Sequence, residues 1–281
     1  MHAVPTSRAA RLEARRARAR RAIAVSAVSA VVVIGGVSAA LMLSPGWHVI
    51  RTTFFSWHYF SAVLPSLFSA FWLDVRLFLI IEAIVLALGL LIALVRTLTA
   101  PVLYPFRLIA AIYVDVLRGI PLLILLYLVA FGVNALAFSF LPTDYTVLGG
   151  VALALCYSAY VSEVFRAGIE SIHPSQPAAA FALGLTRTQT LRYVVVPQAV
   201  RRVAPPLLND FIGLTKDVAL VSILGPQEMV RVAQINADLS FNYTPFIAAA
   251  AIYLLITLPL IRVVDFQRRR ALRQQNAVVM M

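Results

Sequence analysis

The side chains of this chain that could do chemistry are polar residues set inside long apolar runs. An ionisable or amide side chain in such a run usually faces a helix-bundle interior or a watery cavity, because hydrocarbon surroundings penalise it. The candidates for such functional positions are Glu82, Asn134, Asn209, Asp210, Lys216 and Asp217. Lys216 and Asp217 are neighbours that would point about 100° apart on a helix, so each is expected to pair with some other residue.

Glu163 and Arg166 form a second candidate group with a different spacing. Residues three apart on a helix lie on the same face, so these side chains are predicted to form a local ion pair. We favour a structural role for this pair over a role as a gate.

No enzyme motif accompanies these residues. The four histidines, which are His2, His48, His58 and His173, lack the spacing of metal ligands, and the chain has neither a GxSxG elbow nor a GxxxxGK[ST] phosphate loop. A single cysteine, Cys156, excludes an internal disulfide and a cysteine-based metal cluster. The sequence therefore indicates no catalysis, no metal and no cofactor bound by this chain.

The elements that must position the polar residues are membrane spans. Of the 281 residues, 61% are hydrophobic and 13% charged, whereas soluble domains are about 45–50% apolar. This composition predicts an all-α polytopic membrane protein. A span needs about 20 mostly apolar residues, and the segments that qualify are 22–43, 76–95, 120–141, 147–165, 207–224 and 246–264.

The arginines concentrate at both ends of the chain and give it a net charge of +12. Short basic segments stay on the cytoplasmic side of a membrane, so both termini and the loops 96–118 and 166–202 are expected there. No basic stripe on a soluble face is visible, so we expect no nucleic-acid partner. The predicted regions are a basic cytoplasmic arm (1–21), an N-terminal span (22–43), an external aromatic interfacial segment (44–75), a transmembrane domain (76–264) and a basic cytoplasmic tail (265–281).

The first span could in principle be a cleaved signal peptide. Its apolar run exceeds the roughly 7–15 residues of a signal core, so an uncleaved anchor is expected. The segment 44–75 holds all three tryptophans among several phenylalanines. An aromatic belt at the membrane interface accounts for this composition better than a ligand-binding platform does.

The longest cytoplasmic loop contains the run HPSQPAAAFALGLTRTQTLRYVVVPQAVRR, residues 173–202. Ser175 is expected to cap a short helix that ends at Gly184 in a left-handed conformation. Thr186 and Gln189 form a capping box that starts a second short helix, which Pro197 is expected to interrupt. Two short helices rich in alanine could dock another protein, or the loop could lie on lipid headgroups; the residues alone do not separate these readings.

The loop resembles the signature EAA loop of ABC importer permeases. The resemblance rests on a run of residues in this order: Gln176, Ala179, Ala180, Ala182, Leu183, Gly184, Leu185, Leu191, Pro197, Gln198 and Ala199. Two other stretches, LRGIPLL at 117–123 and PPLLNDFIGLTKDVALVS at 205–222, are similar to the polar amino acid branch of that family. The resemblance covers roughly residues 74–270.

Membership of this family would imply a five-helix type I permease core in a bacterial plasma membrane, with residues 22–43 as an extra span and 166–205 as the coupling loop. It implies ATPase subunits that bind the ATP, a second permease subunit that is either a homologue or another copy, and an extracytoplasmic solute-binding protein. The ATPase-coupling residues would be Ala178, Ala179, Ala182, Gly184 and Leu185. The path through the membrane would be lined from Glu82, Asn134, Asn209, Lys216 and Asp217.

Two features depart from the family pattern. Ala178 stands where the family usually has the glutamate that names the loop, and residues 22–43 add a span to the usual five. The substrate is expected to be a polar amino acid. The resemblance suggests glutamate, glutamine or a basic amino acid, and Lys216 favours an anionic one such as glutamate. The competing functions are a self-powered secondary transporter or channel, which should show an internal repeat or a midplane charge relay, and a membrane anchor without transport.

Overall fold

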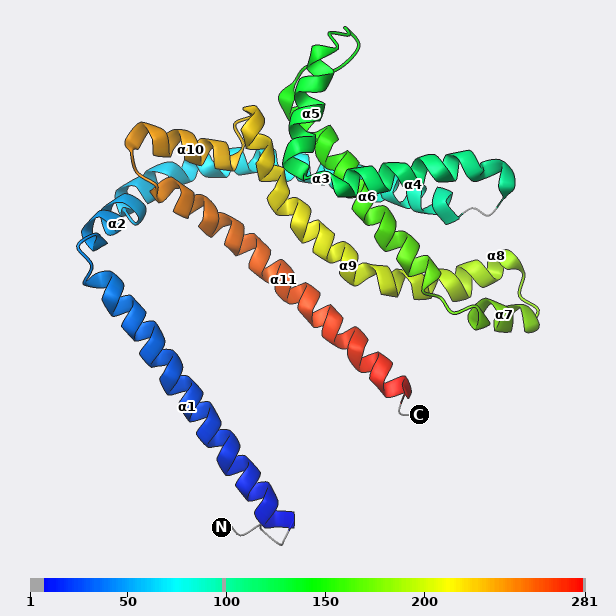
Figure 1. The fold of residues 1–281 in the computed structure, drawn as a ribbon, viewed down its shortest axis with the longest axis horizontal. Helices are drawn as coiled ribbons and strands as arrows, with labels where there is room; N and C mark the ends of the chain where they lie inside the picture. The colour runs from blue at the N-terminus through cyan, green and yellow to red at the C-terminus, as the bar shows by residue number, and fades with distance from the viewer. Residues whose placement is uncertain (1–7, 98–99, 280–281) are drawn as a thin grey trace. The chain divides into compact units, whose positions relative to one another are not determined.

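The computed structural model describes residues 8–97 and 100–279, with side chains for 21–97 and 100–267, and all regular structure in those residues is helical. In chain order the helices are α1 (Arg8–Met42), α2 (Trp47–Phe54), α3 (Trp57–Thr97), the 3₁₀ helix η1 (Pro101–Leu103), α4 (Tyr104–Gly119), α5 (Leu122–Ala135), α6 (Tyr145–Glu170), α7 (Ser175–Ala182), α8 (Arg187–Thr190), the π-helix η2 (Leu191–Val195), α9 (Val196–Asp217), the 3₁₀ helix η3 (Val218–Leu224), α10 (Met229–Ser240) and α11 (Thr244–Val279). Figure 1 follows them along the chain.

The chain divides into two compact units at the Ser56–Trp57 junction. The first contains α1 and α2. Its segment Arg21–Met42 is long and apolar enough to cross a membrane, and none of its side chains is buried; Val31, for example, is 71% exposed. An exposed apolar helix is what a lipid-facing span requires. The segment coincides with the predicted span at 22–43, which stays a prediction.

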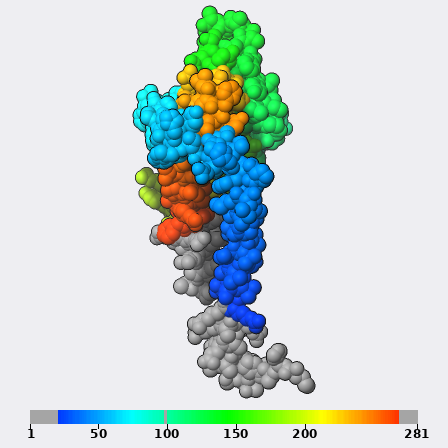
Figure 2. Space-filling model, turned by 90° about the vertical axis from the view of Figure 1, so that its left-hand side faces the viewer, coloured from blue at the N-terminus to red at the C-terminus, as the bar shows by residue number. Residues whose placement is uncertain are grey.

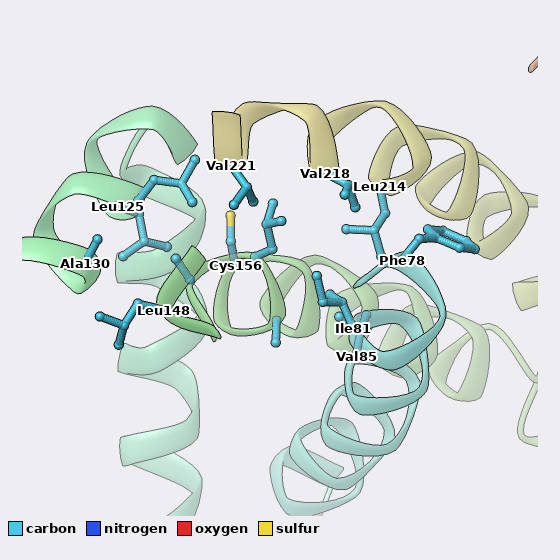
Figure 3. Close-up of a cluster of buried hydrophobic side chains, with 14 of the residues drawn as sticks. Phe78, Ile81, Val85, Leu125, Ala130, Leu148, Cys156, Leu214, Val218 and Val221 are labelled. Carbon is cyan, nitrogen blue, oxygen red and sulfur yellow. The ribbon is translucent and has the colours of Figure 1, made fainter. Parts of the chain in front are cut away.

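The second unit is built around the long helices α3 and α6, which pack on each other and on α4, α5 and α9. Phe78, Val85, Leu148 and Leu214 belong to its largest buried cluster, which also contains Cys156 (Figure 3). A close approach of α3 to α6 depends on Gly89, because a Cβ there would lie 2.7 Å from the Cγ1 atom of Val161. This packing fixes α6, which carries two of the polar candidates, Glu163 and Arg166.

A second buried cluster joins the first part of α3 to α10 and α11. Val63 and Leu67 of α3 pack with Met229 and Ala233 of α10 and with Ala249 of α11. Figure 2 shows the same neighbourhood from outside, with the cyan turns of α3 beside the orange surface of α10. The sequence did not indicate α10, which lies in a stretch that was expected to be a connection.

Fewer helices than the six predicted spans are long and apolar enough to cross a membrane. Four helices qualify among the described residues, or five if the bent pair of Pro101–Gly119 and Leu122–Ala135 counts as one span. The predicted span at 207–224 is not among them, because α9 carries Arg201, Arg202, Asp210, Lys216 and Asp217 and gives way to the 3₁₀ helix η3. The count of six therefore stays a prediction.

Two predicted boundaries differ from the structure. Residues 96–118 were expected to form a loop, but most of them form α4, which packs on α3 and α6 through Val114 and ends in a 111° bend before α5. Arg76, where a span was expected to begin, lies well inside α3, whose 41 residues correspond to a length of about 60 Å. That length exceeds a hydrocarbon core of about 30 Å, so α3 includes much of the segment 44–75 as a helical extension.

Candidate functional site

A pocket of about 440 Å³ opens where the α4–α5 bend meets α6 and α9. Its lining residues are Arg118, Gly119, Ile120, Pro121, Leu122, Cys156, Tyr157, Tyr160, Asp210 and Asp217. A span was expected to begin at residue 120; in the structure Gly119 ends α4, and Ile120 and Pro121 have extended backbone before α5. Proline disfavours helical backbone in the residue before it, which explains why the helix breaks there. Residues 118–122, at the break, all belong to the lining of the pocket.

The side of the pocket formed by α6 and α9 is acidic. The Tyr157 hydroxyl donates a 2.7 Å hydrogen bond to Oδ2 of Asp217. Gly213 makes room for this contact, since a Cβ at that position would lie 3.0 Å from the Tyr157 hydroxyl oxygen. Oδ2 of Asp210 is buried and has no hydrogen-bond partner in the described structure. Because a buried carboxylate without a partner is costly, this wall of the pocket suits a cationic group.

The lining of the pocket also carries a positive charge, on Arg118. The guanidinium of Arg118 lies 5.5 Å from the centre of the Tyr160 ring, and its Nη1 atom is 3.9 Å from Oε1 of Glu163. Its side chain is 43% exposed. The lining therefore contains one cation and two carboxyl groups, a combination of charges that is complementary to a zwitterion.

Glu163 is the centre of an ion-pair cluster that ties three helices together. It pairs with Arg96 of α3, with Nη2 of Arg166 at 2.7 Å, and more loosely with Arg118 of α4. Arg166 in turn pairs with Glu170 at 2.7 Å. The predicted Glu163–Arg166 pair is thus present as part of a larger network, in which Arg96 and Arg118 could not be foreseen from local spacing.

The other candidates for a path are distributed unevenly. Asp217 lines the pocket, and Glu82 on α3 is half-buried and interacts electrostatically with Asp210. Asn134 donates its amide hydrogen bond to the Ala130 carbonyl of its own helix. Asn209 and Lys216 are exposed and do not line this pocket. The structure therefore brings the acidic candidates together, whereas Asn134, Asn209 and Lys216 lie outside the pocket lining.

The first helix of the loop between α6 and α9, which is α7, has a well-defined C-terminal end. The backbone of Gly184 has φ of +81°, and the amides of Gly184 and Leu185 donate to the carbonyls of Phe181 and Ala180. This pair of bonds is the Schellman arrangement that closes a helix C-terminus and favours glycine. Ala178, Ala179 and Ala182 are exposed on α7, and Leu185 is half-buried.

The second half of the loop differs from the expected short helix. Thr186 and Gln189 do form a capping box at the start of α8. Pro197, however, does not interrupt the helix, because the π-helix η2 precedes it and α9 continues from Val196. The wider π turn accommodates a proline that has no amide hydrogen and would clash with the carbonyl four residues earlier. The chain from α8 to α9 is therefore one continuous helical element.

A third polar cluster was missed by the sequence reasoning. Asp74 of α3 and Glu228, which precedes α10, are both buried, and Tyr253 of α11 donates a 3.3 Å hydrogen bond to Oδ2 of Asp74. Glu228 accepts hydrogen bonds from the amides of Val230 and Arg231 and so caps α10. Burial, together with the nearby Asp74 carboxyl, raises the pKa of Glu228 to about 7. The backbone amide of Met229 also donates a hydrogen bond to Asp74, although the two residues are 155 positions apart in the sequence. No local pattern could indicate a cluster built from contacts of this range.

Taken together, the spans, the pocket and the structured loop define an all-helical subunit of a multi-pass membrane transporter. The family of binding-protein-dependent transport system inner membrane components matches residues 88–273. The chain belongs to this family, and the prediction of an ABC importer permease of the polar amino acid branch is confirmed.

Individual relatives agree with this assignment. The "Probable amino-acid permease protein YxeN" of Bacillus subtilis (strain 168) is 31% identical, over 72% of this chain and 89% of its own length. The arginine transport system permease protein ArtQ of the same bacterium is 33% identical, over 71% and 90%. In a solved structure described as an amino acid ABC transporter with histidines, a chain that is 35% identical superposes with a TM-score of 0.66, over 73% of this chain and 94% of that one. The similarity confirms the all-α type I permease fold.

Proposed function

We propose that this chain forms part of the path of an ATP-driven importer for a polar amino acid, in a bacterial plasma membrane, with both termini in the cytoplasm. The observation that carries the proposal is the pocket at the α4–α5 bend, whose lining contains both Arg118 and the carboxyl groups of Asp210 and Asp217. Every amino acid carries an ammonium and a carboxylate group, so a lining with charges of both signs suits the whole class. Broken helices near the middle of a membrane are a recurrent way of building such sites.

Within that class, a neutral polar side chain such as that of glutamine suits the pocket better than glutamate. The two carboxyl groups of the lining oppose a second carboxylate on the substrate, and Lys216, which favoured glutamate in the sequence, is exposed and lies outside the lining. Uptake of labelled glutamine into cells in competition with unlabelled glutamate tests this preference. Equal competition by glutamate and glutamine would contradict it.

The loop of residues 175–199 is the proposed contact with a separate ATPase. Phe181 and Leu183 are 50% and 81% exposed beside the small alanine side chains of α7, so an apolar surface is available for another protein. Since α8 runs into α9 without a break, and α9 carries Asp210 and Asp217, a displacement of the loop is passed directly to the pocket wall. Such a rigid connection can bias the two states of a transporter when the ATPases close. Position 178 is alanine instead of the family's usual glutamate, and this difference leaves the apolar surface of α7 in place.

Co-purification tests the coupling. The tagged chain is isolated from its native membrane in mild detergent, and its partners are identified by mass spectrometry, for wild type, Gly184→Arg and Gly184→Ala. Both variants carry the strain of a side chain at φ +81°, but only arginine adds bulk, since a Cβ alone meets nothing within 4 Å. An ABC ATPase should accompany the wild type and Gly184→Ala and be lost from Gly184→Arg. Retention of the ATPase by Gly184→Arg would place the contact elsewhere, and its absence from the wild-type complex would favour a self-powered transporter.

The same preparation identifies the other proposed partners. A second permease subunit is required to complete the path, as a homologue or as another copy of this chain, and an extracytoplasmic solute-binding protein delivers the amino acid. One permease species in the purified complex indicates two copies, and two species indicate a heterodimer.

A further inference from the structure

Arg118 is shared between the pocket and the Glu163 cluster. Its guanidinium lines the pocket and lies over the Tyr160 ring, while its Nη1 atom is 3.9 Å from Oε1 of Glu163. No other residue that lines this pocket takes part in an ion pair in the described part of the chain. A charge that enters the pocket therefore meets a group that also belongs to the cluster holding α3, α4 and α6 together.

Arg118 is the loosest of the three cations around Glu163. Arg96 and Arg166 are each hydrogen-bonded to one of the two Glu163 oxygens, and their side chains are 13% and 29% exposed. The Arg118 contact is longer than a hydrogen bond, and its side chain is the most exposed of the three, at 43%. Glu163 thus keeps two close partners when Arg118 leaves, and the departure costs little because an exposed, long ion pair contributes weakly.

A carboxylate in the pocket offers Arg118 a stronger partner. Guanidinium and carboxylate groups form paired, parallel hydrogen bonds that a single long contact cannot match. The Arg118 guanidinium lies 5.5 Å from the centre of the Tyr160 ring, and the side chain is 43% exposed, so it is accessible to a ligand. Asp210 and Asp217 belong to the same lining and are acceptors for the ammonium group of the same molecule.

We propose that Arg118 recognises the α-carboxylate of the transported amino acid and leaves Glu163 when it does so. This inference rests on the proposed function, because it assigns a residue to the substrate of that pocket. Occupancy of the pocket then releases α4 from the cluster near the end of α6, which leads into the coupling loop. Arg118 is accordingly a specificity-determining residue, and Glu163 a positioning residue that acts through it.

Equilibrium binding to the purified permease–ATPase complex, without the binding protein, tests the inference. The probes are L-glutamine, L-glutamate and L-arginine, each compared with its α-carboxamide, in which the carboxylate is replaced by a neutral group. The wild type should bind at least one of the amino acids (the acid form, with a free α-carboxylate) about tenfold or more tightly than the corresponding α-carboxamide (the amide form). This difference is expected for a paired charge-assisted contact. In Arg118→Gln this acid-to-amide ratio should fall to near one, and Arg118→Lys should lie between.

Arg107→Gln is the matched control. Arg107 lies on the same helix and contacts a tyrosine ring in the same way, with its guanidinium 5.3 Å from the centre of the Tyr104 ring, but it does not line the pocket. Its acid-to-amide ratio should equal that of the wild type. Affinity for the amide, which does not use the carboxylate, shows that each variant retains a folded pocket.

Glu163→Gln tests the second half of the inference. Once Glu163 no longer attracts Arg118, the acid should bind somewhat more tightly, up to about fivefold, with amide binding unchanged. The double variant Arg118→Gln/Glu163→Gln should behave as Arg118→Gln alone. A ratio that stays high in Arg118→Gln, or a wild-type complex that binds no acid better than its amide, overturns the inference. The co-purified ATPase would still support the permease function in that case, so the two failures are distinguishable.

Discussion

Substituting Gly168 by alanine should destabilise the junction at which α6 enters the coupling loop. Gly168 is buried two residues before the end of α6, and a Cβ there would overlap the Cγ1 methyl of Val203 on α9. Valine has a stiff χ1 angle, and Val203 itself is 6% exposed, so it cannot turn aside. Overpacking of this kind costs about 1–3 kcal/mol, although alanine alone favours a helix interior by about 1 kcal/mol over glycine. The net loss should be about 0–2 kcal/mol.

Thermal unfolding of the purified protein in detergent measures this loss. About 1 kcal/mol lowers the midpoint of a chain of this size by roughly 2–4 °C. Gly132→Ala on α5 is the matched control, because a Cβ there meets nothing within 4 Å and only the gain in helix propensity remains. Its midpoint should stay level or rise, so that the difference between the two variants is about 1–3 kcal/mol.

The double variant Gly168→Ala/Val203→Ala isolates the contact. Removing the valine methyls relieves the overlap, so Val203→Ala should cost less in the Gly168→Ala background than in the wild type, and the difference is a measurable coupling energy. If Gly168→Ala is as stable as Gly132→Ala and the cycle shows no coupling, the close packing of α6 on α9 is not as the structure has it.

Three further perturbations follow from the polar clusters and caps. Burial raises the pKa of Glu228 from 4.5 to about 7, so the folded protein keeps this proton over a pH interval in which the unfolded chain loses it. The free energy of unfolding should therefore fall as pH rises from 4.5 to about 7. Glu228→Gln should make this fall smaller, and an unchanged pH profile would count against the burial of Glu228. Asp74→Asn removes a buried carboxyl that has no cationic partner among the described residues and keeps an acceptor for the Tyr253 hydroxyl, so the midpoint should rise; a lower midpoint would indicate an unseen cation. Thr186→Ala removes the cap of α8, at about 1 kcal/mol, and should speed hydrogen exchange of the Gln189 amide about fivefold, whereas an unchanged rate would argue against the capping box.

Local signals in the sequence predicted the end of α7 and the start of α8, but not the start of α7, where the N-cap is Pro174 instead of Ser175 and no side chain caps the helix. Gly184 and the Thr186–Gln189 box act within three to five residues, so their geometry does not depend on the rest of the fold. The same locality explains the Glu163–Arg166 pair. The prediction failed at Pro197, because a π turn absorbs the proline and that choice depends on how α9 packs.

The pocket and the buried carboxyl cluster depend on contacts that no local pattern encodes. Arg96 reaches Glu163 across 67 residues, and Tyr253 reaches Asp74 across 179. Apolar periodicity predicted spans, but it could not show that residues 96–118 would pack as α4. Nor could it show that Asn209 and Lys216 would be exposed and lie outside the lining to which Asp217 belongs. Polar residues in apolar runs are therefore good candidates as a set, while tertiary packing selects among them.

The central claim, that the loop of residues 175–199 contacts a separate ATPase, is tested most directly by site-specific cross-linking. The single cysteine, Cys156, is buried and can be replaced by serine, after which Leu183→Cys, at an 81% exposed position, takes a benzophenone–maleimide label. Phe140→Cys, at a 79% exposed position in the α5–α6 connection, is the control. Irradiation of the native complex should join the ATPase to position 183 and not to position 140. A complex that hydrolyses ATP but yields no ATPase adduct from position 183 would contradict the account.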